Sequence, residues 1–291
     1  SARSYYFGFY WELAMNELKY WVGLSSFVGL GIKRLNFLRQ QFGSIQKIWE
    51  AGPELNANWK NKLDLDREME RLERYQIKTL TLEDENYPKL LKQTDFAPFI
   101  IYVKGSIEVL NQPGITVIGT RKMSEYGRKV TAKLVGGLAK KLTIVSGLAR
   151  GVDGWAHRVC LGVKGKTVAV LGHGLDRVYP PEHAGLAEQI VNSGGALISE
   201  FPLDYPISKQ NFPQRDRILA GLTLGTLVIE GSQKSGTKIT AGFAADYGRE
   251  VFCVPGPIDS PNSAGPAELI QNGAKLVTKI EDILEEINLP V

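Results

Sequence analysis

The spacing of apolar positions changes near residue 80 of this chain. Before that point apolar side chains recur at helical intervals, as Leu35, Leu38 and Phe42 do, and breaks such as Gly43-Ser44 separate the runs. Strand-like runs are scarce there. The pattern predicts a small all-α module over residues 1–80 and then a connector over residues 81–112, with extended structure around Phe99 to Val103.

Beyond residue 112, short apolar, β-branched runs alternate with segments long enough to form helices. Each run fits a strand that is buried on both faces. Repeated strand–helix units predict an α/β domain over residues 113–291, with a doubly wound, mainly parallel sheet and right-handed crossovers. The expected strands cover residues 115–118, 143–145, 167–171, 196–199, 227–229 and 251–254, with one helix running to Lys141 and another starting at Lys279.

The composition of the 291 residues is that of a globular protein. With 43% hydrophobic and 23% charged residues, the chain is neither disordered nor collagen-like. Every apolar stretch is shorter than the ~18 residues of a membrane helix, and the aromatic stretch Tyr5 to Tyr10 lacks the features of a signal peptide. We therefore expect no membrane span. The net charge of +4 permits anionic partners without requiring them.

The sulfur and imidazole side chains do not suggest a metal site. Cys160 and Cys253 each lie in an apolar run, so we expect buried thiols in a reducing compartment. The two Cys and three His have no metal-ligand spacing, and no metal is expected.

Glycine and hydroxyl residues gather where the predicted strands end, which is the edge that binds ligands in doubly wound sheets. After residues 115–118, Gly119 and Thr120 let a ligand approach the backbone, and Arg121 can bind a phosphate with two hydrogen bonds. The alternative is a tight turn with a surface arginine. After residues 143–145, small residues again expose backbone amides; the candidate contacts are Ser146, Gly147, Ala149 and Arg150.

Two ionisable residues follow that second loop. Asp153 is either the N-cap of the next helix or a ligand contact. His157 lies one helical turn later, and we interpret the two as a structural pair rather than as an acid–base couple.

The loop after residues 227–229 superficially resembles a phosphate loop. Its candidate contacts are Lys234, Ser235, Gly236 and Thr237, but the Gly-Lys-Ser/Thr ending of a Walker loop is absent, so a Walker NTPase is not expected. These residues can still hold a phosphate. Glu230, at the predicted strand end, is either an acid–base group or an orienting partner for a nearby arginine or amide.

A further segment combines cations with an aromatic ring. Arg215 and Arg217 are two positions apart and cannot share a helical face, so one can face a phosphate and the other a structural carboxylate. Phe212 near Lys209 offers a stacking face beside a cation, as in single-stranded nucleic-acid binding, with core packing as the alternative. Residues 172–174 lack the third glycine of a dinucleotide fingerprint, which argues against an NAD enzyme; no cofactor is expected.

Taken in order, these motifs resemble the DNA-processing protein A family, also called Smf, the recombination mediators of bacterial natural transformation. The resemblance extends over nearly all the chain from about residue 20. The matching stretches are Gly119-Thr120-Arg121, Ser146–Asp153 with Ala156-His157, Ala169–Asp176 with Tyr179-Pro180, Ser199-Glu200, Phe212–Ile218, Ser235–Thr237, and Gly248–Phe252 with Val254–Gly256.

The resemblance implies an extended Rossmann-like domain that binds single-stranded DNA without catalysis. It also implies a cytoplasmic homodimer that loads the RecA recombinase onto DNA coated by single-strand-binding protein. Residues 28–35 are similar to the family's helix-hairpin-helix or sterile-alpha-motif-like module. Carried onto matching positions, Arg121 and Lys209 bind phosphate and Phe212 stacks on a base, while Asp153, His157 and Glu230 are expected to be structural or orienting.

The chain departs from the family pattern at three places. Asp216 replaces the usual Asn, so a carboxylate would weaken DNA binding unless it pairs with an arginine. Lys238 adds a cation where the family has Leu, and Gly231 replaces an Ala. We also expect no C-terminal winged-helix module after Val291.

The alternative function is that of a nucleoside-monophosphate phosphoribohydrolase of the lysine-decarboxylase-like fold. Such enzymes carry an acidic residue shortly after the glycine loop, but here Thr240 and Ala241 occupy the expected positions. A purely oligomeric scaffold is a third option, which the phosphate-friendly loops disfavour.

Overall fold

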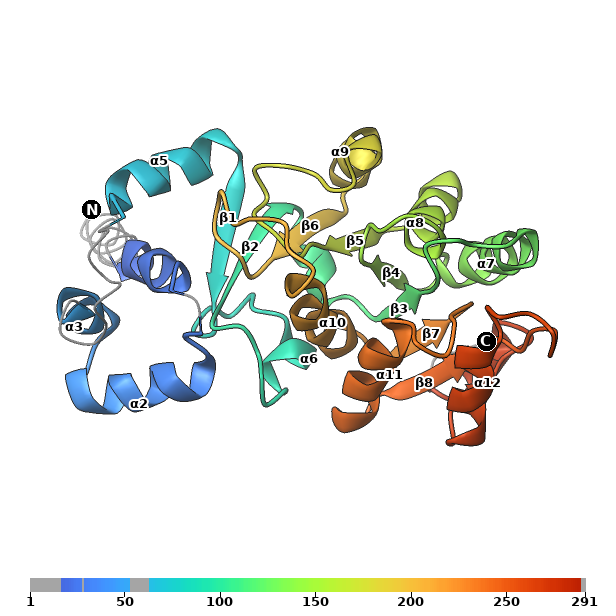
Figure 1. Cartoon of the computed structure of the whole chain (residues 1–291). Helices are drawn as coiled ribbons and strands as arrows, with labels where there is room; N and C mark the ends of the chain where they lie inside the picture. Colours follow the sequence, from blue (N-terminus) through green and yellow to red (C-terminus); the bar gives the residue numbers. More distant parts are fainter. Residues whose placement is uncertain (1–16, 28, 53–62, 289–291) are drawn as a thin grey trace.

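A nine-stranded sheet organises most of the chain in the computed structural model, which describes residues 17–27, 29–52 and 63–288 (Figure 1). The strand order is β1-β2-β6-β5-β4-β3-β7-β8-β9, and all neighbours from β6 to β9 are parallel. The bounds are β1 Ile77–Thr81, β2 Ile100–Gly105, β3 Gly114–Ile118, β4 Thr143–Ser146, β5 Thr167–Val170, β6 Ala196–Ser199, β7 Gly225–Val228, β8 Glu250–Cys253 and β9 Lys275–Leu276.

The predicted fold class is confirmed, since all six expected strands are present within two residues of their expected ends. Their continuous apolar runs are explained by burial from both sides. Ile115 of β3 packs in one cluster with Leu134, while Ile118 of the same strand packs in another with Ile218 and Leu219. Side chains that point to opposite sides of the strand therefore pack against two different helix layers.

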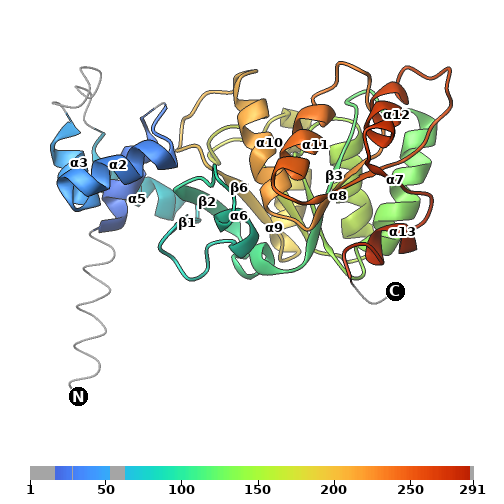
Figure 2. The ribbon, with the colours of Figure 1, turned by 90° about the horizontal axis from the view of Figure 1, so that it is seen from below.

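Helices cover both faces of this sheet (Figure 1). The connections from β3 to β6 form one layer, and the helices that follow β6 form most of the other (Figures 1 and 2). The first layer contains α7 Glu125–Leu138, α8 Val152–Gly162 and α9 Ala184–Asn192, and the second contains α6 Lys89–Lys92, α10 Asn211–Gly221, α11 Thr237–Asp246 and α12 Ala264–Gln271. The short helix α13, Glu281–Leu284, corresponds to the helix expected from Lys279.

The predicted helical module lies at one end of the elongated molecule, with α12 and α13 towards the other end (Figure 2). Its described helices are a segment over residues 17–25, α2 Ile32–Phe42, α3 Ile45–Glu50 and α5 Leu65–Arg74. Ser44 and Asp64 cap α3 and α5 with their side-chain oxygens. The stretch Tyr5 to Tyr10 and Val28 lie outside the described residues.

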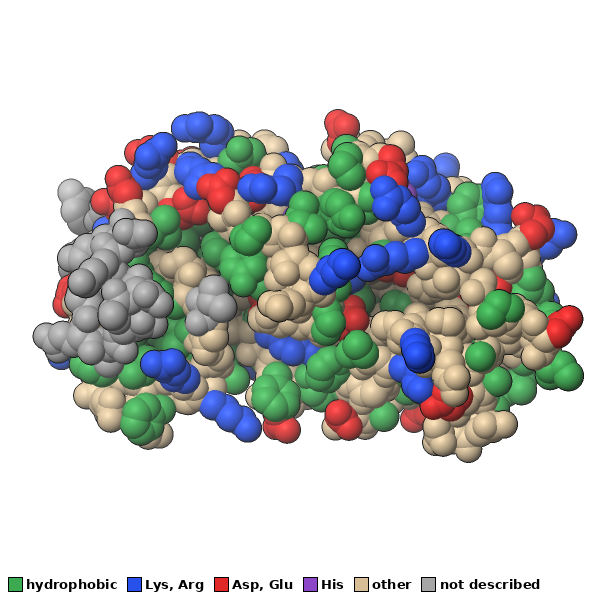
Figure 3. Space-filling model, viewed as in Figure 1, with side chains coloured by type: hydrophobic (Ala, Val, Ile, Leu, Met, Phe, Trp, Pro, Cys, Tyr) green, Lys and Arg blue, Asp and Glu red, His purple; other side chains and the backbone are tan. Residues whose placement is uncertain are grey.

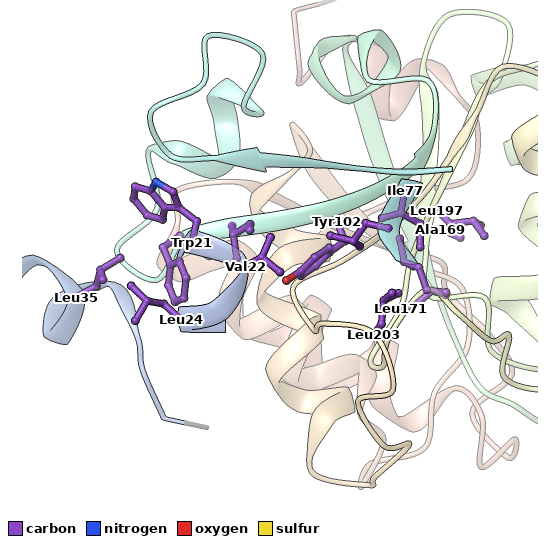
Figure 4. Close-up of a cluster of buried hydrophobic side chains, with 14 of the residues drawn as sticks. Trp21, Val22, Leu24, Leu35, Ile77, Tyr102, Ala169, Leu171, Leu197 and Leu203 are labelled. Atoms are coloured by element: carbon purple, nitrogen blue, oxygen red, sulfur yellow. The ribbon is translucent and has the colours of Figure 1, made fainter. Parts of the chain in front are cut away.

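The module and the sheet share one hydrophobic cluster (Figure 4). Trp21, Leu24 and Leu35 of the module belong to it together with Tyr102 of β2 and Leu171, which follows β5. Tyr102 also forms a 2.6 Å hydrogen bond with the Ser25 hydroxyl. The division at residues 80 and 112 stays a prediction, and both β1 and β2 belong to the main sheet as antiparallel strands.

Both cysteines are free and buried, as predicted from their apolar surroundings. No helix in the described part of the chain has the length and apolarity needed to cross a membrane.

Candidate functional site

Strand β3 lies at the point where the winding of the sheet reverses. The chain runs outward from β3 through β4, β5 and β6, then returns to place β7 on the other side of β3. The loops after β3 and β7 therefore flank the switch point where such sheets bind ligands, and we call the region between these loops the crevice. The two loops are joined by a 2.8 Å hydrogen bond from the Thr120 amide to the Glu230 carbonyl.

The turn after β3 packs tightly against the start of α8. A Cβ on Gly119 would lie 2.5 Å from a methyl group of Val152, and one on Gly151 would lie 2.2 Å from the Thr120 carbonyl oxygen. Gly151 also has a φ of 76°, a conformation that favours glycine. The Val152 amide donates to the Thr120 carbonyl at 3.2 Å. These contacts fix the backbone from which Arg121 projects.

An aromatic and cationic cluster is formed at this edge of the sheet. The guanidinium carbon of exposed Arg121 lies 5.4 Å from the ring centroid of Phe212, at the start of α10. That of Arg215 lies 5.9 Å from the same centroid, and the ring of Tyr179 lies 6.3 Å away at a tilt of 36°. Phe212 is half-buried, so it contributes to packing and also offers a partly accessible ring.

Other cations lie in loops at the same edge. Lys209 is exposed in the loop that leads from β6 into α10, and Lys234 is exposed in the loop after β7. Among the described residues, Arg121, Lys209 and Lys234 form no ion pair. Figure 3 shows Lys and Arg side chains in a row across the middle of this face, above α10 and α11 in the view. These cations are available to anions.

The sequence predicts that one of the two arginines of α10 faces a phosphate and the other a structural carboxylate, but in the structure both contact internal partners. Arg215 is buried; its Nη1 donates to the Val170 carbonyl at 2.6 Å and its Nε lies 3.1 Å from the Asp216 carboxylate. Arg217 forms two hydrogen bonds of 2.9 and 2.6 Å with the Glu200 carboxylate. Both guanidinium groups are thus held by internal partners. Asp216, the departure from the family pattern, is one of those partners.

In the loop after β4, the first residues are buried and bonded to internal partners, whereas the sequence predicted that they are exposed to a ligand. The buried Ser146 hydroxyl donates to the Val117 carbonyl at 2.6 Å, and the Gly147 amide donates to Asp153 at 3.2 Å. A Cβ on Gly147 would lie 2.1 Å from Nη1 of Arg215, so the guanidinium occupies the space that glycine leaves. Ala149 is half-buried, and exposed Arg150 bonds Glu182 at 2.5 Å.

The expected pair of Asp153 and His157 does not form. His157 Nδ1 bonds the Thr167 hydroxyl at 2.7 Å, while Asp153 binds the loop before its own helix. Because helical side chains point towards the N-terminus, Asp153 reaches Gly147 instead of His157. Burial raises the pKa of Asp153 to about 6 although Arg215 opposes the shift, and burial lowers the pKa of His157 to about 3.

Glu230 is buried and oriented by the start of α7. Its carboxylate accepts hydrogen bonds from the Ser124 amide at 3.0 Å and from the Ser124 hydroxyl at 2.5 Å. A Cβ on Gly127 would lie 2.2 Å from Oε2, so glycine makes room for the carboxylate. Glu230 therefore joins the two loops of the crevice.

The start of α11 offers another place for an anion. Exposed Lys234 and Gly236 flank Ser235, and the buried Thr237 hydroxyl has no hydrogen-bond partner among the described residues. Amide groups at a helix N-terminus favour a negative charge. Lys238, the added cation, is paired with Glu268 at 2.5 Å.

Sequence reasoning missed two residues of this edge as site candidates. Exposed Lys122 directly follows Arg121, and Tyr179 lies in the β5–α9 loop beside Phe212. Both residues lie in loops that follow predicted strands, and this position could have identified them as site candidates. No cluster of three metal-binding side chains occurs within the described residues.

Comparisons with known proteins identify the family of this chain. The family profile "DNA recombination-mediator protein A" matches residues 78–288. Protein Smf of Escherichia coli is 47% identical over 201 residues, which cover 69% of this chain and 54% of that protein. The DNA processing protein DprA of Streptococcus pneumoniae is 41% identical, over 72% of this chain and 73% of that protein. The chain thus spans about half the length of the Escherichia coli relative.

Solved structures give the same result. The structure of DprA from Streptococcus pneumoniae superposes with a TM-score of 0.73 at 36% identity, over 84% of this chain and 82% of that chain. DNA processing protein A from Helicobacter pylori, solved to describe its unique single-stranded DNA binding mode, has a TM-score of 0.66 at 29% identity, over 73% of this chain and 96% of that chain. The chain therefore belongs to the DNA recombination-mediator protein A family, whose members include the Smf and DprA proteins.

Proposed function

We propose that this chain binds single-stranded DNA at the crevice between β3 and β7. One observation carries the proposal: exposed Arg121 lies over the partly accessible ring of Phe212 at the switch point of the sheet. Cations that bind phosphates and rings that stack on bases are the two components of sequence-tolerant binding to single strands. Lys209 and Lys234 add charge at the same edge.

The contacts divide by role. Arg121, Lys122, Lys209 and Lys234 are the exposed cations that contact phosphates. Thr120 and the start of α11, with Ser235, Gly236 and Thr237, offer backbone amides and hydroxyls. Arg215 acts from beneath Phe212 by holding the ring and the loop after β4 in place.

The biological role that we propose is based on family membership. We propose that the bound strand is handed to the RecA recombinase during DNA processing in natural transformation. A homodimer that acts in the cytoplasm on DNA coated with single-strand-binding protein is part of the same proposal. Support comes from the recombination-mediator profile and from the Helicobacter pylori relative, which is described as binding single-stranded DNA.

The proposed role needs no catalysis by this chain. Glu230 is held by two hydrogen bonds from Ser124, and Thr240 and Ala241 are buried where the phosphoribohydrolase alternative requires an acid. No observation in the described residues favours that alternative. Release of free base from nucleoside monophosphates would be the reaction to assay.

The test is the Arg121→Ala variant in a fluorescence-anisotropy titration with a labelled single strand. Loss of a charge-assisted phosphate contact should weaken binding about tenfold or more. The slope of log K against log salt should become shallower by about 0.7, because one fewer counterion is released.

The matched control is Lys140→Ala, which removes one positive charge from an exposed residue after the C-terminus of α7, near the start of β4. It should bind nearly as the parent protein does. If Arg121→Ala keeps both the affinity and the salt slope of the parent, the crevice is not the DNA site.

A further inference from the structure

A cavity lies between the helical module and the sheet. Its volume is about 270 Å³, and its walls come from three distant parts of the chain. The module contributes residues 29–32, the connector contributes Phe96 to Ile100, and the β6–α10 loop contributes Phe201 and Tyr205. Pockets for drug-sized ligands span about 300–1,000 Å³, so this one suits a single small ring system.

The walls of this cavity are aromatic. Phe201 and Tyr205 stack with centroids 4.4 Å apart and planes 23° apart. Phe96 lines the cavity although 49% of its surface is exposed, so its ring is accessible from solvent. The Lys33 ammonium lies 5.2 Å from the centroid of that ring. An exposed ring under a cation suits a planar group that is attached to an anion.

Polar groups lie at one side of the cavity. Arg217 and Glu200 line it as a nearly buried pair, with side chains 14% and 10% exposed. Exposed Gln214 also lines the cavity, and its side chain partly opposes the rise in the pKa of Glu200 that burial causes. The exposed side-chain amide of Gln214 can both donate to and accept from the edge of a nucleobase.

Helix α10 connects this cavity to the DNA crevice. Phe212, Arg215 and Asp216 share one helical face, which contacts Arg121 and the loop after β4, whereas Gln214 and Arg217 share another face. Phe212 and Arg217 are five residues apart, which corresponds to about 7.5 Å along the helix axis. A stacked strand rises about 3.4 Å per nucleotide, so a few nucleotides cover this distance.

We propose that the cavity takes up one nucleobase of the single strand whose phosphates bind at the β3–β7 crevice. This inference rests on the proposed function, since it assigns a second subsite to the same strand. The base stacks on Phe96 and presents its edge to Gln214, beside the Arg217–Glu200 pair, while Lys33 contacts a neighbouring phosphate. The helical module thereby becomes part of the DNA-binding surface.

The test compares two strands of equal length, oligodeoxythymidylate and an abasic strand, by fluorescence anisotropy. Phe96→Ala and Gln214→Ala are the test variants, and both residues are exposed, so the fold is retained; circular dichroism checks this. Loss of a stacking ring should weaken binding to oligodeoxythymidylate about fivefold or more. Binding to the abasic strand should not change.

Phe37→Ala is the matched control, because Phe37 is an exposed phenylalanine of α2, 56% accessible, that does not line the cavity. It should behave as the parent protein does. In a second arm, photocrosslinking of 4-thiothymidine in the strand should label peptides that contain Phe96 or Tyr205.

The outcomes separate the two proposals. If the parent protein does not bind oligodeoxythymidylate, the proposed function itself fails. If it binds, but Phe96→Ala and Gln214→Ala bind as tightly as Phe37→Ala, only the base pocket is wrong. If free thymidine monophosphate abolishes the crosslink at the concentration of the strand, the cavity is a mononucleotide site and the inference is also wrong.

Discussion

At the scale of single residues, the site is supported by charges that never reach solvent. Arg215 lies between Asp216, the Val170 carbonyl and the backbone of Gly147, and its guanidinium contacts the ring of Phe212 from within. Burial raises the pKa of Asp216, and Arg215 partly offsets this effect. Asp216, where the resemblance to the family predicts an amide, is therefore paired with an arginine.

Asp153 provides a test of this buried network through its pH dependence. Its folded pKa of about 6 lies above its ordinary value of 3.8, so the folded state holds the proton more tightly. Because Asp153 ionises less readily in the folded state, the free energy of unfolding falls as the pH rises from about 4 to 6, by about 1.4 kcal/mol per pH unit. We expect Asp153→Asn to be more stable than the parent at pH 7, by about 1–3 kcal/mol.

Urea unfolding of both proteins between pH 4 and pH 7 measures this difference. The advantage of Asp153→Asn should shrink as the pH falls through 6 and be lost near pH 4. His157, with its pKa lowered to about 3, acts in the opposite sense in both proteins and cancels in the comparison. A stability difference that stays constant over this pH range would contradict the assignment.

At the scale of elements, the site depends on the turns that join strands to helices. The loops after β3, β4 and β7 touch one another through backbone hydrogen bonds and close glycine contacts. Helix α10 is fixed at its start by Asn211, whose amide donates to the carbonyls of Gly172 and Pro206 at 2.9 and 2.7 Å. Because α10 presents one face to the crevice and another to the cavity, its position sets both subsites.

Gly151 tests the turn before α8. A methyl group there would meet the Thr120 carbonyl, and the residue would keep a φ of 76°. We expect Gly151→Ala to lose about 2–5 kcal/mol of unfolding free energy, from backbone strain and overpacking. It should also weaken DNA binding, because the displaced Thr120 precedes Arg121. Thermal unfolding and anisotropy titration measure the two effects.

Gly185→Ala is the control for this substitution. Gly185 is exposed in α9 with nothing near its missing side chain, so alanine should stabilise the helix by about 0.5–1 kcal/mol. Equal effects of the two substitutions would show that the Gly151 turn does not depend on glycine.

At the scale of the whole molecule, the helical module and the sheet share a hydrophobic cluster, and we expect them to unfold as one cooperative unit. Their shared cluster includes Leu24, which is fully buried, and Leu203, which follows β6 (Figure 4). A charged contact crosses the same boundary, because Arg71 of α5 pairs with Asp204 at 2.6 Å. The module should therefore hold its position relative to the DNA crevice.

Leu24→Ala tests this cooperativity. The substitution leaves a cavity in the shared cluster and should cost about 2–5 kcal/mol. Far-ultraviolet circular dichroism reports on the whole fold, whereas tryptophan fluorescence reports mostly on the N-terminal part, because four of the five tryptophans lie before residue 80 and only Trp155 lies beyond it. The midpoints of the two signals should coincide and fall together. Separate transitions for the two signals would mean that the module unfolds independently.

The sequence alone determined the fold class and the edge of the sheet where the site lies. An apolar run between two turns is a local feature of the sequence. Strands such as residues 115–118 and 196–199 can therefore be predicted to be buried on both faces without knowing which strands lie beside them. A glycine or arginine directly after such a run must lie at the carboxyl end of a parallel strand. Arg121 and Lys234 are exposed at that edge for this reason.

Only the tertiary structure decided which charged side chains remain exposed to solvent and which are paired with internal partners. Arg215, Arg217 and Arg121 are equally cationic in the sequence, yet the first two are held by partners that long-range packing brings to them. The Val170 carbonyl, 45 residues from Arg215, belongs to β5 of the sheet. The cavity beside α10 arises in the same way, because its walls come from three segments that meet only in the folded chain.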